Sequence, residues 1–336
     1  MRPAFAAIVR VPILIPILIR VRFLSALAFI AALPALAQGY PSRPVRFIVP
    51  FPPGSSTDAA ARLVAQDLAV ALRGQVVVDN RAGASGNIGT EIVARAAPDG
   101  HTLVLGTTST LAVAVVANAK LGYDPIGDFA PISLIGSSPY VLAVHPALPA
   151  TTLRELITLA RAQPGRISYG SAGNASLGHL AGELFAATTS TRLNHVPYKS
   201  SALAVIDVLS GRIELQWGSI SPTLPHIRSG RLRALATTGI TRVTALPDVP
   251  TAIEAGVPGY EVALWMGVLA PASTPATIVT LLNRQIVAIV TRPAMHEALI
   301  AQGLEPMPGP AATFAAHIRS ETHKWRRVAQ TAGITP

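Results

Sequence analysis

The sequence predicts a two-lobed α/β protein, on three observations. The chain has 336 residues, of which 50% are hydrophobic and 13% charged, and this is more apolar material than one small domain needs. After Gln38, short β-branched segments alternate with glycine-rich turns and amphipathic helices, a pattern typical of parallel strands joined by helices. Neither a repeat nor a low-complexity linker interrupts this pattern, so we expect strands or short crossovers to join the lobes, an arrangement that suits a hinge.

Residues 1–37 are interpreted as a signal peptide. They contain four arginines and no acidic residue, then an apolar segment at 23–33 and the small residues Ala35 and Ala37 before Gln38, which is the order of a secretory signal and its cleavage site. A membrane anchor is the alternative. It would place Arg20 and Arg22 within the span, at a cost of about 2.5–3.5 kcal/mol each. We therefore expect cleavage and a periplasmic protein.

Charge and cysteine content exclude several classes of function. The formal net charge of +10 falls to +6 once the four arginines of residues 1–37 are removed. The remaining basic residues are scattered singly, without the stripe that tracks phosphates, so nucleic-acid binding is not expected. The absence of cysteine excludes disulfides, thiolate metal sites and cysteine nucleophiles.

The expected strands are short and separated mostly by helices. The first is Val45–Val49, followed by the helix Ser56–Leu72. Further strands are expected at residues 76–79, 102–105, 140–144, 167–169, 194–196, 214–217, 232–237 and 264–270.

Hydroxyl residues mark the starts of several helices. Pairs of Ser or Thr precede helices at 153–161, 202–209 and 275–290, where a hydroxyl can accept a hydrogen bond from an orphan backbone N–H. These pairs are Thr151 and Thr152, Ser200 and Ser201, and Ser273 and Thr274. Two more helices are expected at 293–302 and 311–329, with Gly303 and Gly333 as C-terminal stops.

Four turns rich in glycine and hydroxyl residues each lie between a strand and a helix, at 50–58, 83–89, 106–110 and 170–176. A helix N-terminus carries about half a positive charge and unpaired N–H groups, so several such turns facing one cleft would bind an anion without any arginine. Alternatively, each turn only caps its own helix. The presence of four such turns favours a shared anion site.

Several motifs of this chain resemble those of one family. They are PSRPVRFIVPFPPG at 41–54, VDNRAG at 78–83, GNIGT at 86–90, PDGHTL at 98–103, YGSAG at 169–173, GHLAGE at 178–183, HVPYK at 195–199, PDVPT at 247–251 and GVLAPA at 267–272. Together they resemble the Bug or TctC proteins, periplasmic solute receptors of tripartite tricarboxylate transporters. The resemblance covers nearly all of residues 40–334.

The resemblance implies a type II periplasmic-binding-protein fold, in which two lobes close over a ligand cleft by a hinge. Residues 41–140 plus 243–336 would form lobe 1, and residues 141–242 would form lobe 2. The expected ligand is a small carboxylate, such as a dicarboxylate, a tricarboxylate, an amino acid or an aromatic acid. The implied partners are the membrane subunits of the transporter, with a monomeric receptor and no cofactor or metal.

The resemblance also implies the ligand-binding residues. Those of lobe 1 would be Phe51, Pro53, Gly54, Ser55, Ser56, Thr57, Asp58, Asn87, Thr107, Thr108 and Ser109. Those of lobe 2 would be Ser171, Gly173, Asn174, Tyr198 and Asp207. The chain departs from the family at Ser55 and at Ser200-Ser201, where glycine is usual, and we expect both changes to alter the pocket.

Individual residues also have ordinary structural interpretations. Trp217 could line the cleft and stack on a flat ligand, but a tryptophan that ends a strand is more often part of the core. Asp207 could bind the ligand or lie on a solvated helix face. His179 and His195 are interpreted as structural.

Two other functions are alternatives to solute binding. A secreted enzyme would need a catalytic motif, and the sequence has no G-x-S-x-G, H-E-x-x-H, P-loop or G-x-G-x-x-G motif, so we expect no catalysis. A receptor of the same fold could instead signal through a membrane sensor protein. The sequence leaves transport and signalling open.

Overall fold

The computed structural model describes residues 39–117, 120–198 and 201–334. The chain divides into Met1–Ser42 and a compact unit, Arg43–Pro336. In the first of these, only residues 39–42 are described, without helix or strand, so the expected signal peptide at 1–37 lies outside the described residues. In the described part of the chain, no helix combines the length and apolar character that a membrane span requires.

Strands and helices alternate along the compact unit. The strands are β1 (Val45–Val49), β2 (Val76–Asn80), β3 (Thr102–Thr107), β4 (Phe129–Val144), β5 (Ser168–Ser171), β6 (Asn194–Pro197), β7 (Leu215–Ser219), β8 (Arg233–Thr237), β9 (Ala263–Pro271) and β10 (Glu305–Pro306). The helices are α2 (Ser56–Leu72), α3 (Asn87–Ala94), α4 (Ala114–Ala117), α5 (Leu153–Ala162), α6 (Leu177–Thr189), α7 (Ser201–Leu209), α8 (Ile220–Arg228), α9 (Ala276–Val290), α10 (Pro293–Ala301) and α11 (Ala311–Thr331). A 3₁₀ turn, η1 (Ala84–Gly86), and a π-helical turn, η2 (Ser109–Val113), precede α3 and α4.

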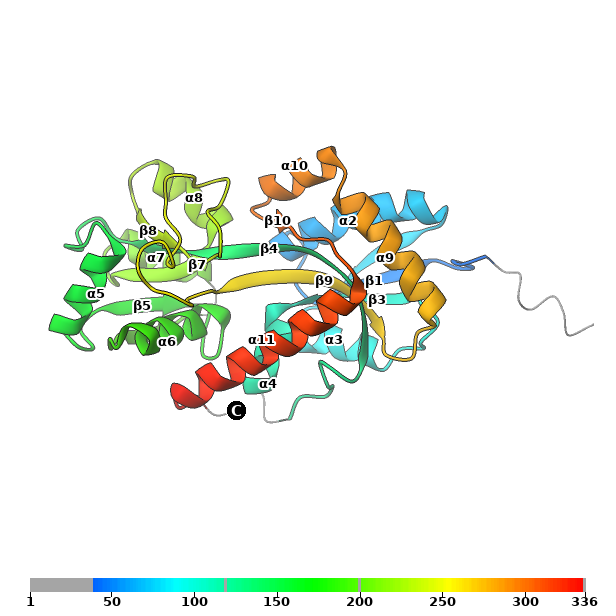
Figure 1. The fold of residues 1–336 in the computed structure, drawn as a ribbon, viewed down its shortest axis with the longest axis horizontal. Coiled ribbons are helices and arrows are strands. Elements are labelled where there is room, and N and C mark those ends of the chain that lie inside the picture. Colours follow the sequence, from blue (N-terminus) through cyan, green and yellow to red (C-terminus); the bar gives the residue numbers. More distant parts are fainter. Residues whose placement is uncertain (1–38, 118–119, 199–200, 335–336) are drawn as a thin grey trace, which may run out of the picture. The chain divides into compact units, whose positions relative to one another are not determined.

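The strands form two sheet regions that share β4. In the first region β1 pairs in parallel with β2 and β3, and β9 lies antiparallel between β3 and β4. In the second region the end of β4 pairs antiparallel with β7 and β8, and β5 pairs in parallel with β6 and β7. Figure 1 shows β4 and β9 running between the two regions. This confirms the predicted two-lobed α/β fold, in which strands connect the lobes.

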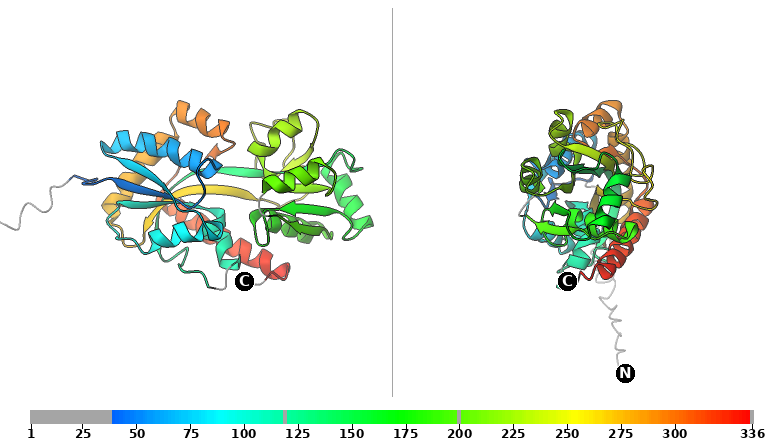
Figure 2. Two further views of the ribbon diagram at one scale, coloured as in Figure 1. Left: turned by 180° about the vertical axis from the view of Figure 1, so that it is seen from behind. Right: turned by 90° about the vertical axis from the view of Figure 1, so that its left-hand side faces the viewer.

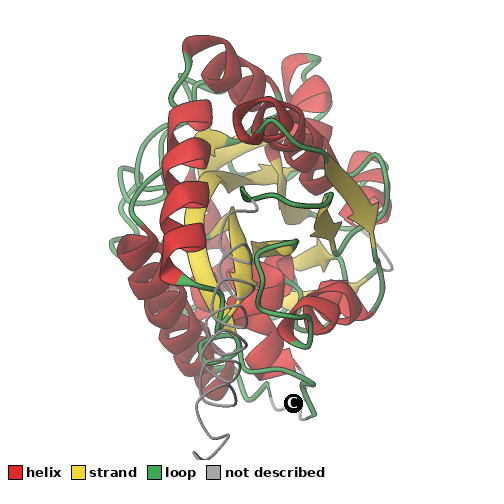
Figure 3. Cartoon of the chain, turned by 90° about the vertical axis from the view of Figure 1, so that its right-hand side faces the viewer, coloured by secondary structure: helices red, strands yellow, loops and turns green. Residues whose placement is uncertain are grey.

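Helices cover the outside of the strands, which lie in the interior (Figure 3). The buried run Val45, Phe47, Ile48 and Val49 is typical of a parallel strand covered on both faces. Helix α11 contacts β4, α4 and α6, and its Glu321 accepts hydrogen bonds from the indole N–H groups of Trp265, at 3.2 Å, and Trp325, at 3.1 Å. The C-terminal helix is thereby fixed to β9.

Most expected elements agree with the structure. Helix α2 has the predicted bounds, and Thr152 caps α5 by accepting a hydrogen bond from the N–H of Glu155. Gly303 and Gly333 have φ angles of 75° and 67°, as a C-terminal stop in the left-handed region requires.

One expectation about these elements was wrong, and one strand is longer than expected. The hydroxyl of Thr274 caps nothing, because α9 has Pro275 at its N-cap and Thr274 Oγ1 has no partner among the described residues. The strand expected at 140–144 is part of β4, which begins at Phe129. Proline is uncommon inside a long strand, and β4 contains Pro131 and Pro139. Its pairing with β9 is irregular, with register shifts at Pro131/Ser133 and Leu134/Gly136.

Thr108 connects the end of β3 to β9. Its fully buried hydroxyl donates to the carbonyl of Ala263 and accepts from the N–H of Trp265, both at 2.9 Å. Replacing Thr108 with valine keeps the shape but leaves both backbone groups buried without this partner, so we predict that Thr108→Val lowers the free energy of unfolding by about 1–3 kcal/mol. Chemical denaturation measures this loss. Thr280→Val on the exposed side of α9 is the control, and an equal effect in both variants would contradict the prediction.

Candidate ligand-binding site

A cleft of about 500 Å³ lies between elements of the two sheet regions. In the left view of Figure 2, α2 and α7 lie on the side of the strands that faces the viewer. Every residue that lines the cleft in the described part of the chain is uncharged. These residues are Gly54, Ser55, Ser56, Ala59, Ser138, Ser201, Ala202, Ser219, Ser221, Pro222, Leu264, Met266, Gln302 and Leu304.

One wall of the cleft is the start of α2. Phe51 and the exposed Pro53 lead into Gly54, whose φ of 78° favours glycine. Ser55 is the N-cap, and its hydroxyl accepts a hydrogen bond from the N–H of Asp58 at 3.2 Å. The N–H groups of Ser56 and Thr57 have no acceptor among the described residues. The positive end of a helix and the free N–H of Ser56, which lines the cleft, therefore lie at this wall, and the second free donor, that of Thr57, follows it in the first turn of α2.

The backbone of Ser55 does not adopt a conformation that favours glycine. Its φ of −71° and ψ of 160° are ordinary for an N-cap. The serine found in place of the family's usual glycine therefore adds a cap and a cleft-lining hydroxyl without strain. Ser200, the other departure, lies outside the described residues, and Ser201 lines the cleft.

Asp58 holds the α2 turn in place. Its side chain, 5% exposed, accepts hydrogen bonds from the N–H of Gly54 at 2.9 Å, from Arg62 at 3.0 Å and from Asn80 at 2.8 Å. Burial alone would raise the pKa of Asp58, but these donors lower it below the usual range. The carboxylate is therefore ionised, and its negative charge is compensated locally.

The opposite wall contains the starts of α7 and α8. Helix α7 begins at Ser201, and Ser219 is the N-cap of α8. The N–H groups of Ile220 and Ser221 have no acceptor among the described residues. The sequence analysis singled out Ser201 at this wall but not the start of α8. Ser219 at a strand end, with Pro222 in the next helical turn, was a signal that could have indicated it.

The floor of the cleft is apolar. Leu264 and Met266 of β9 lie on the same face as Ser138 of β4, which pairs with Leu264, and Leu304 completes this surface. An elongated ligand with a polar group at each end and hydrocarbon between them matches this arrangement.

The predicted lobe 1 residues outside the α2 turn lie beside that turn and are not among the residues that line the cleft. They are Asn87, Thr107, Thr108 and Ser109. A Cβ on Gly86 would come within 2.7 Å of Thr110 and 3.2 Å of Phe51, so the three turns pack closely. The hydroxyl of Tyr123 donates to the side chain of Asn87 at 2.9 Å. Thr107 and Thr108 are fully buried, and Ser109 is partly buried.

The predicted lobe 2 residues form two hydrogen-bonded groups. The Ser171 hydroxyl, 2% exposed, contacts the carbonyl of Gly173 at 3.0 Å and His195 Nε2 at 2.6 Å, while Asn174 is exposed. The hydroxyl of Tyr198 donates to Asp207 at 2.8 Å.

In the second of these groups the phenol of Tyr198 stays protonated. Burial and the bond to Asp207 raise the pKa of Tyr198 to about 12, so the phenol keeps its proton. Asp207 also pairs with Arg212 at 3.0 Å. Asp207 therefore has two partners of its own and is not simply a solvated residue.

Trp217 lies in the core. Its side chain is 1% exposed, with the rings of Tyr169 and Phe185 at 5.2 and 5.3 Å. Trp217 therefore has the surroundings of a core residue, as its ordinary structural interpretation expects. Trp217 is not among the residues that line the cleft.

His179 and His195 stack beside the 171–176 turn. Their rings are 3.8 Å apart at an interplanar angle of 11°. Nδ1 of His179 accepts a hydrogen bond from the N–H of Ala175 at 2.9 Å, so this nitrogen carries no proton. Burial and the neighbouring His179 lower the pKa of His195 to about 4, and burial lowers the pKa of His179. Both rings are therefore neutral at pH 7.

We predict that acid destabilises the protein through this pair. Because the pKa of His195 is near its usual 6.5 in the unfolded chain and about 4 in the fold, the unfolded state binds more protons between these values. The free energy of unfolding should be highest above pH 6.5 and fall as the pH drops toward 4. Denaturant titrations at several pH values measure it. His195→Gln should make the fall shallower, whereas His296→Gln on the exposed face of α10 should not. An identical slope in His195→Gln and the unaltered protein would contradict the prediction.

Comparison with known proteins shows which family the chain matches. Residues 60–334 match the family described as the tripartite tricarboxylate transporter family receptor, TctC. The protein BugT of Bordetella pertussis is 40% identical over 303 residues, covering 90% of this chain and 93% of BugT.

Solved structures show the same fold. The Rpa4515 protein of R. palustris, determined with adipate, has a TM-score of 0.78 and 39% identity, and covers 88% of this chain and 99% of its own. MatC of Rhodopseudomonas palustris, with bound malate, has a TM-score of 0.73 and 30% identity, and covers 86% of this chain and 99% of its own. BugD, described as a periplasmic binding protein, has a TM-score of 0.74 and 33% identity, and covers 88% of this chain and 99% of its own.

These matches confirm the resemblance found in the sequence, together with the predicted periplasmic-binding-protein fold. Because the family match spans most of the described residues and is supported by a relative of 40% identity over nearly full length, the chain belongs to the TctC family of periplasmic solute-binding receptors.

Proposed function

We propose that this receptor captures a linear dicarboxylate in its cleft and delivers it to the membrane subunits of a tripartite tricarboxylate transporter. The observation that carries the proposal is the position of helix starts at both walls, α2 on one side and α7 and α8 on the other. Each wall can hold one carboxylate by backbone N–H groups and serine hydroxyls. Leu264, Met266 and Leu304 would contact the hydrocarbon between the two carboxylates.

Closure of the two lobes over the ligand is part of the proposal. We assign residues 41–140 and 243–336 to lobe 1 and residues 141–242 to lobe 2. The pairing of β4 supports this boundary, because Pro139 pairs with β9 of the first region and Tyr140 pairs with β7 of the second. Bending of β4 near this point would move one wall toward the other.

We also propose how the chain is exported and how it releases its ligand. The chain would be exported by a cleaved signal peptide at 1–37, act as a monomer in the periplasm, and release its ligand chemically unchanged. Adipate in the related Rpa4515 structure and malate in MatC support a dicarboxylate as the ligand class.

A ligand series tests the proposal. We predict that adipate or a shorter dicarboxylate raises the unfolding temperature, because a ligand at 100 times its Kd stabilises the fold by about 2.7 kcal/mol. Adipamide has the same length without charge and is the control. Mass spectrometry of the recovered ligand checks that it is unchanged. Equal stabilisation by adipamide, or turnover of the ligand, would contradict the proposal.

The α2 wall can be tested without loss of the helix cap. Aspartate caps a helix as well as serine does, so Ser55→Asp should leave the unfolding temperature unchanged or raised. Its added charge at the cleft should weaken dicarboxylate binding at least about tenfold, which is about 1.4 kcal/mol. Calorimetric titration measures the affinity. Thr152→Asp at the start of α5 makes the same change outside the residues that line the cleft and should bind normally, so an unaltered affinity in Ser55→Asp would refute the role of this wall.

A further inference from the structure

One residue of the cleft, Gln302, differs from the others in the chemistry of its side chain. The other polar side chains that line the cleft are serines, and Gln302 is the only carboxamide among the described lining residues. A carboxamide offers both N–H donors and a carbonyl acceptor. Gln302 is exposed, and its side chain makes no hydrogen bond to a described residue. Its donors and its acceptor are therefore available to a ligand.

The backbone at Gln302 is held in place by the end of α10. Gln302 is the C-cap of this helix. The next two N–H groups, of Gly303 and Leu304, donate to carbonyls of the last turn of α10 at 2.8 and 3.0 Å, an ending that the φ of 75° at Gly303 permits. Leu304 is buried, and β10 then pairs with β4. The side chain of Gln302 thus extends from a fixed point.

The other end of α10 is connected to α2. Arg292, the N-cap of α10, forms an ion pair with Asp67 of α2. Met295 and Leu299 are the buried residues of the helix. Figure 1 shows α10 between α8 and α2. Because contacts hold α10 at both ends, its last residues keep their position at the cleft.

Gln302 lies beside the wall that the start of α8 forms. A Cβ built on the adjacent Gly303 would lie 3.8 Å from the backbone nitrogen of Ser221 and 3.7 Å from its Cβ. Ser221 and Gln302 both line the cleft, and the N–H of Ser221 has no acceptor among the described residues. A free backbone donor and a free carboxamide are therefore neighbours at this wall.

A carboxylate is the ligand group that these two neighbours fit. Its oxygens can accept from the N–H of Ser221 and from the side-chain N–H of Gln302, and the positive end of α8 favours a negative charge. An ammonium group has donors only, so it would meet the free N–H of Ser221 with no acceptor to offer. Since no charged residue lines the cleft in the described part of the chain, neutral groups make this distinction.

We propose that Gln302 is a specificity-determining residue, which binds the second carboxylate of the ligand together with the N–H of Ser221. This inference rests on the proposed function and identifies the side chain that distinguishes a dicarboxylate from an amino acid of similar length. Gln302 belongs to the segment assigned to lobe 1 and Ser221 to the segment assigned to lobe 2. A carboxylate held by both would therefore connect the two lobes.

Adipate and 6-aminohexanoate test this role, because both have a carboxylate at one end and they differ in charge at the other. In calorimetric titrations, the unaltered protein should bind adipate at least about tenfold more tightly than 6-aminohexanoate. Gln302→Leu has a similar size and no donor, so it should weaken adipate binding at least about fivefold through the loss of a hydrogen bond to a charged group.

Gln302→Glu should change the preference toward the amino acid. The new carboxylate would repel the second carboxylate of adipate and attract the ammonium group, so the ratio of the two affinities should shift at least about twentyfold toward 6-aminohexanoate. Ala301→Glu is the matched control, because it adds the same charge at the adjacent exposed position, which does not line the cleft. At about 0.15 M salt, which screens exposed charges, it should change the ratio less than about threefold. Unaltered unfolding temperatures would show that the variants fold.

The outcomes separate the role of Gln302 from the proposed function. If the unaltered protein binds neither adipate nor a shorter dicarboxylate, the proposed function is refuted and this inference with it. If the unaltered protein binds adipate, an unchanged affinity ratio in Gln302→Glu, or an equal shift in Ala301→Glu, would overturn the role of Gln302 alone.

Discussion

Unpaired backbone N–H groups at helix starts are the constraint on which the rest of this structure depends. The first turn of a helix cannot satisfy its own donors, and here the starts of α2, α7 and α8 lie at the walls of one cleft. The carboxylate of Asp58, in the first turn of α2, accepts hydrogen bonds from Gly54, Arg62 and Asn80. The free donors of Ser56 and Thr57 therefore remain for an anion from solution. This explains how a receptor can select carboxylates with no basic side chain among the described residues that line its cleft.

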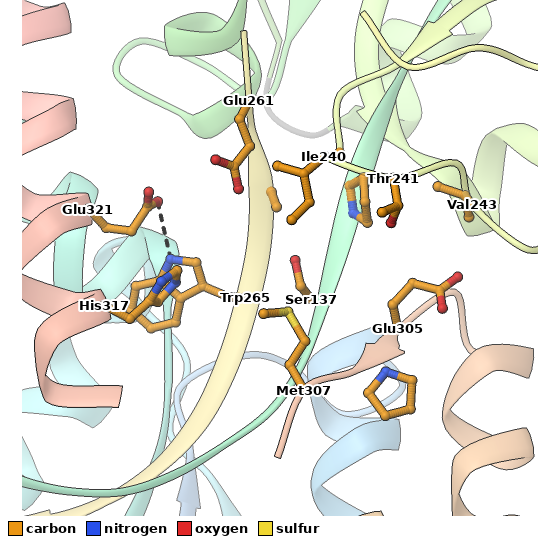
Figure 4. Close-up of a pocket in the computed structure, with 14 residues that line it drawn as sticks. Ser137, Ile240, Thr241, Val243, Glu261, Trp265, Glu305, Met307, His317 and Glu321 are labelled. Carbon is orange, nitrogen blue, oxygen red and sulfur yellow. Dashed lines mark hydrogen bonds between the residues drawn. The ribbon is translucent and has the colours of Figure 1, made fainter. Parts of the chain in front are cut away.

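The two strands between the lobes separate two chemical environments. Strands β4 and β9 present Ser138, Leu264 and Met266 to the cleft, and Ser137, Ala263 and Trp265 to a second cavity on their other face (Figure 4). Register decides this division, because a shift by one residue would exchange the two sets. Thr108 helps to hold the register, since its hydroxyl bonds both Ala263 and Trp265. The same strand therefore supports an amide- and hydroxyl-lined cleft on one face and a carboxylate-lined pocket on the other.

Much of the fold could be predicted from the sequence, because local signals agreed with the tertiary structure. The N-cap at Ser55 and the turn at Gly54 carried residue types that only a few conformations favour. The length of β4 could not be predicted, because its prolines are accommodated by irregular pairing with β9. That strand gains its stability from long-range partners, which a local pattern does not contain.

Part of the lining of the cleft could be predicted, while the assignment of ligand-binding residues stays a prediction. The α2 turn was found because it combines glycine, serine and a helix start, and these residues do line the cleft. Ser219 and Ser221 were missed, since two serines are a weak signal until the fold brings α8 opposite α2. Trp217 is the opposite case. Its ring could have lined the cleft and stacked on a flat ligand, but it packs against Tyr169 and Phe185 in the core.

Amide chemical shifts measured by NMR during a titration with adipate test the central claim most directly. If backbone donors at the helix starts hold the carboxylates, the largest changes will occur at the N–H groups of Ser56, Thr57 and Ser221. Changes confined to other surfaces, with these three amides unaffected, would contradict the account.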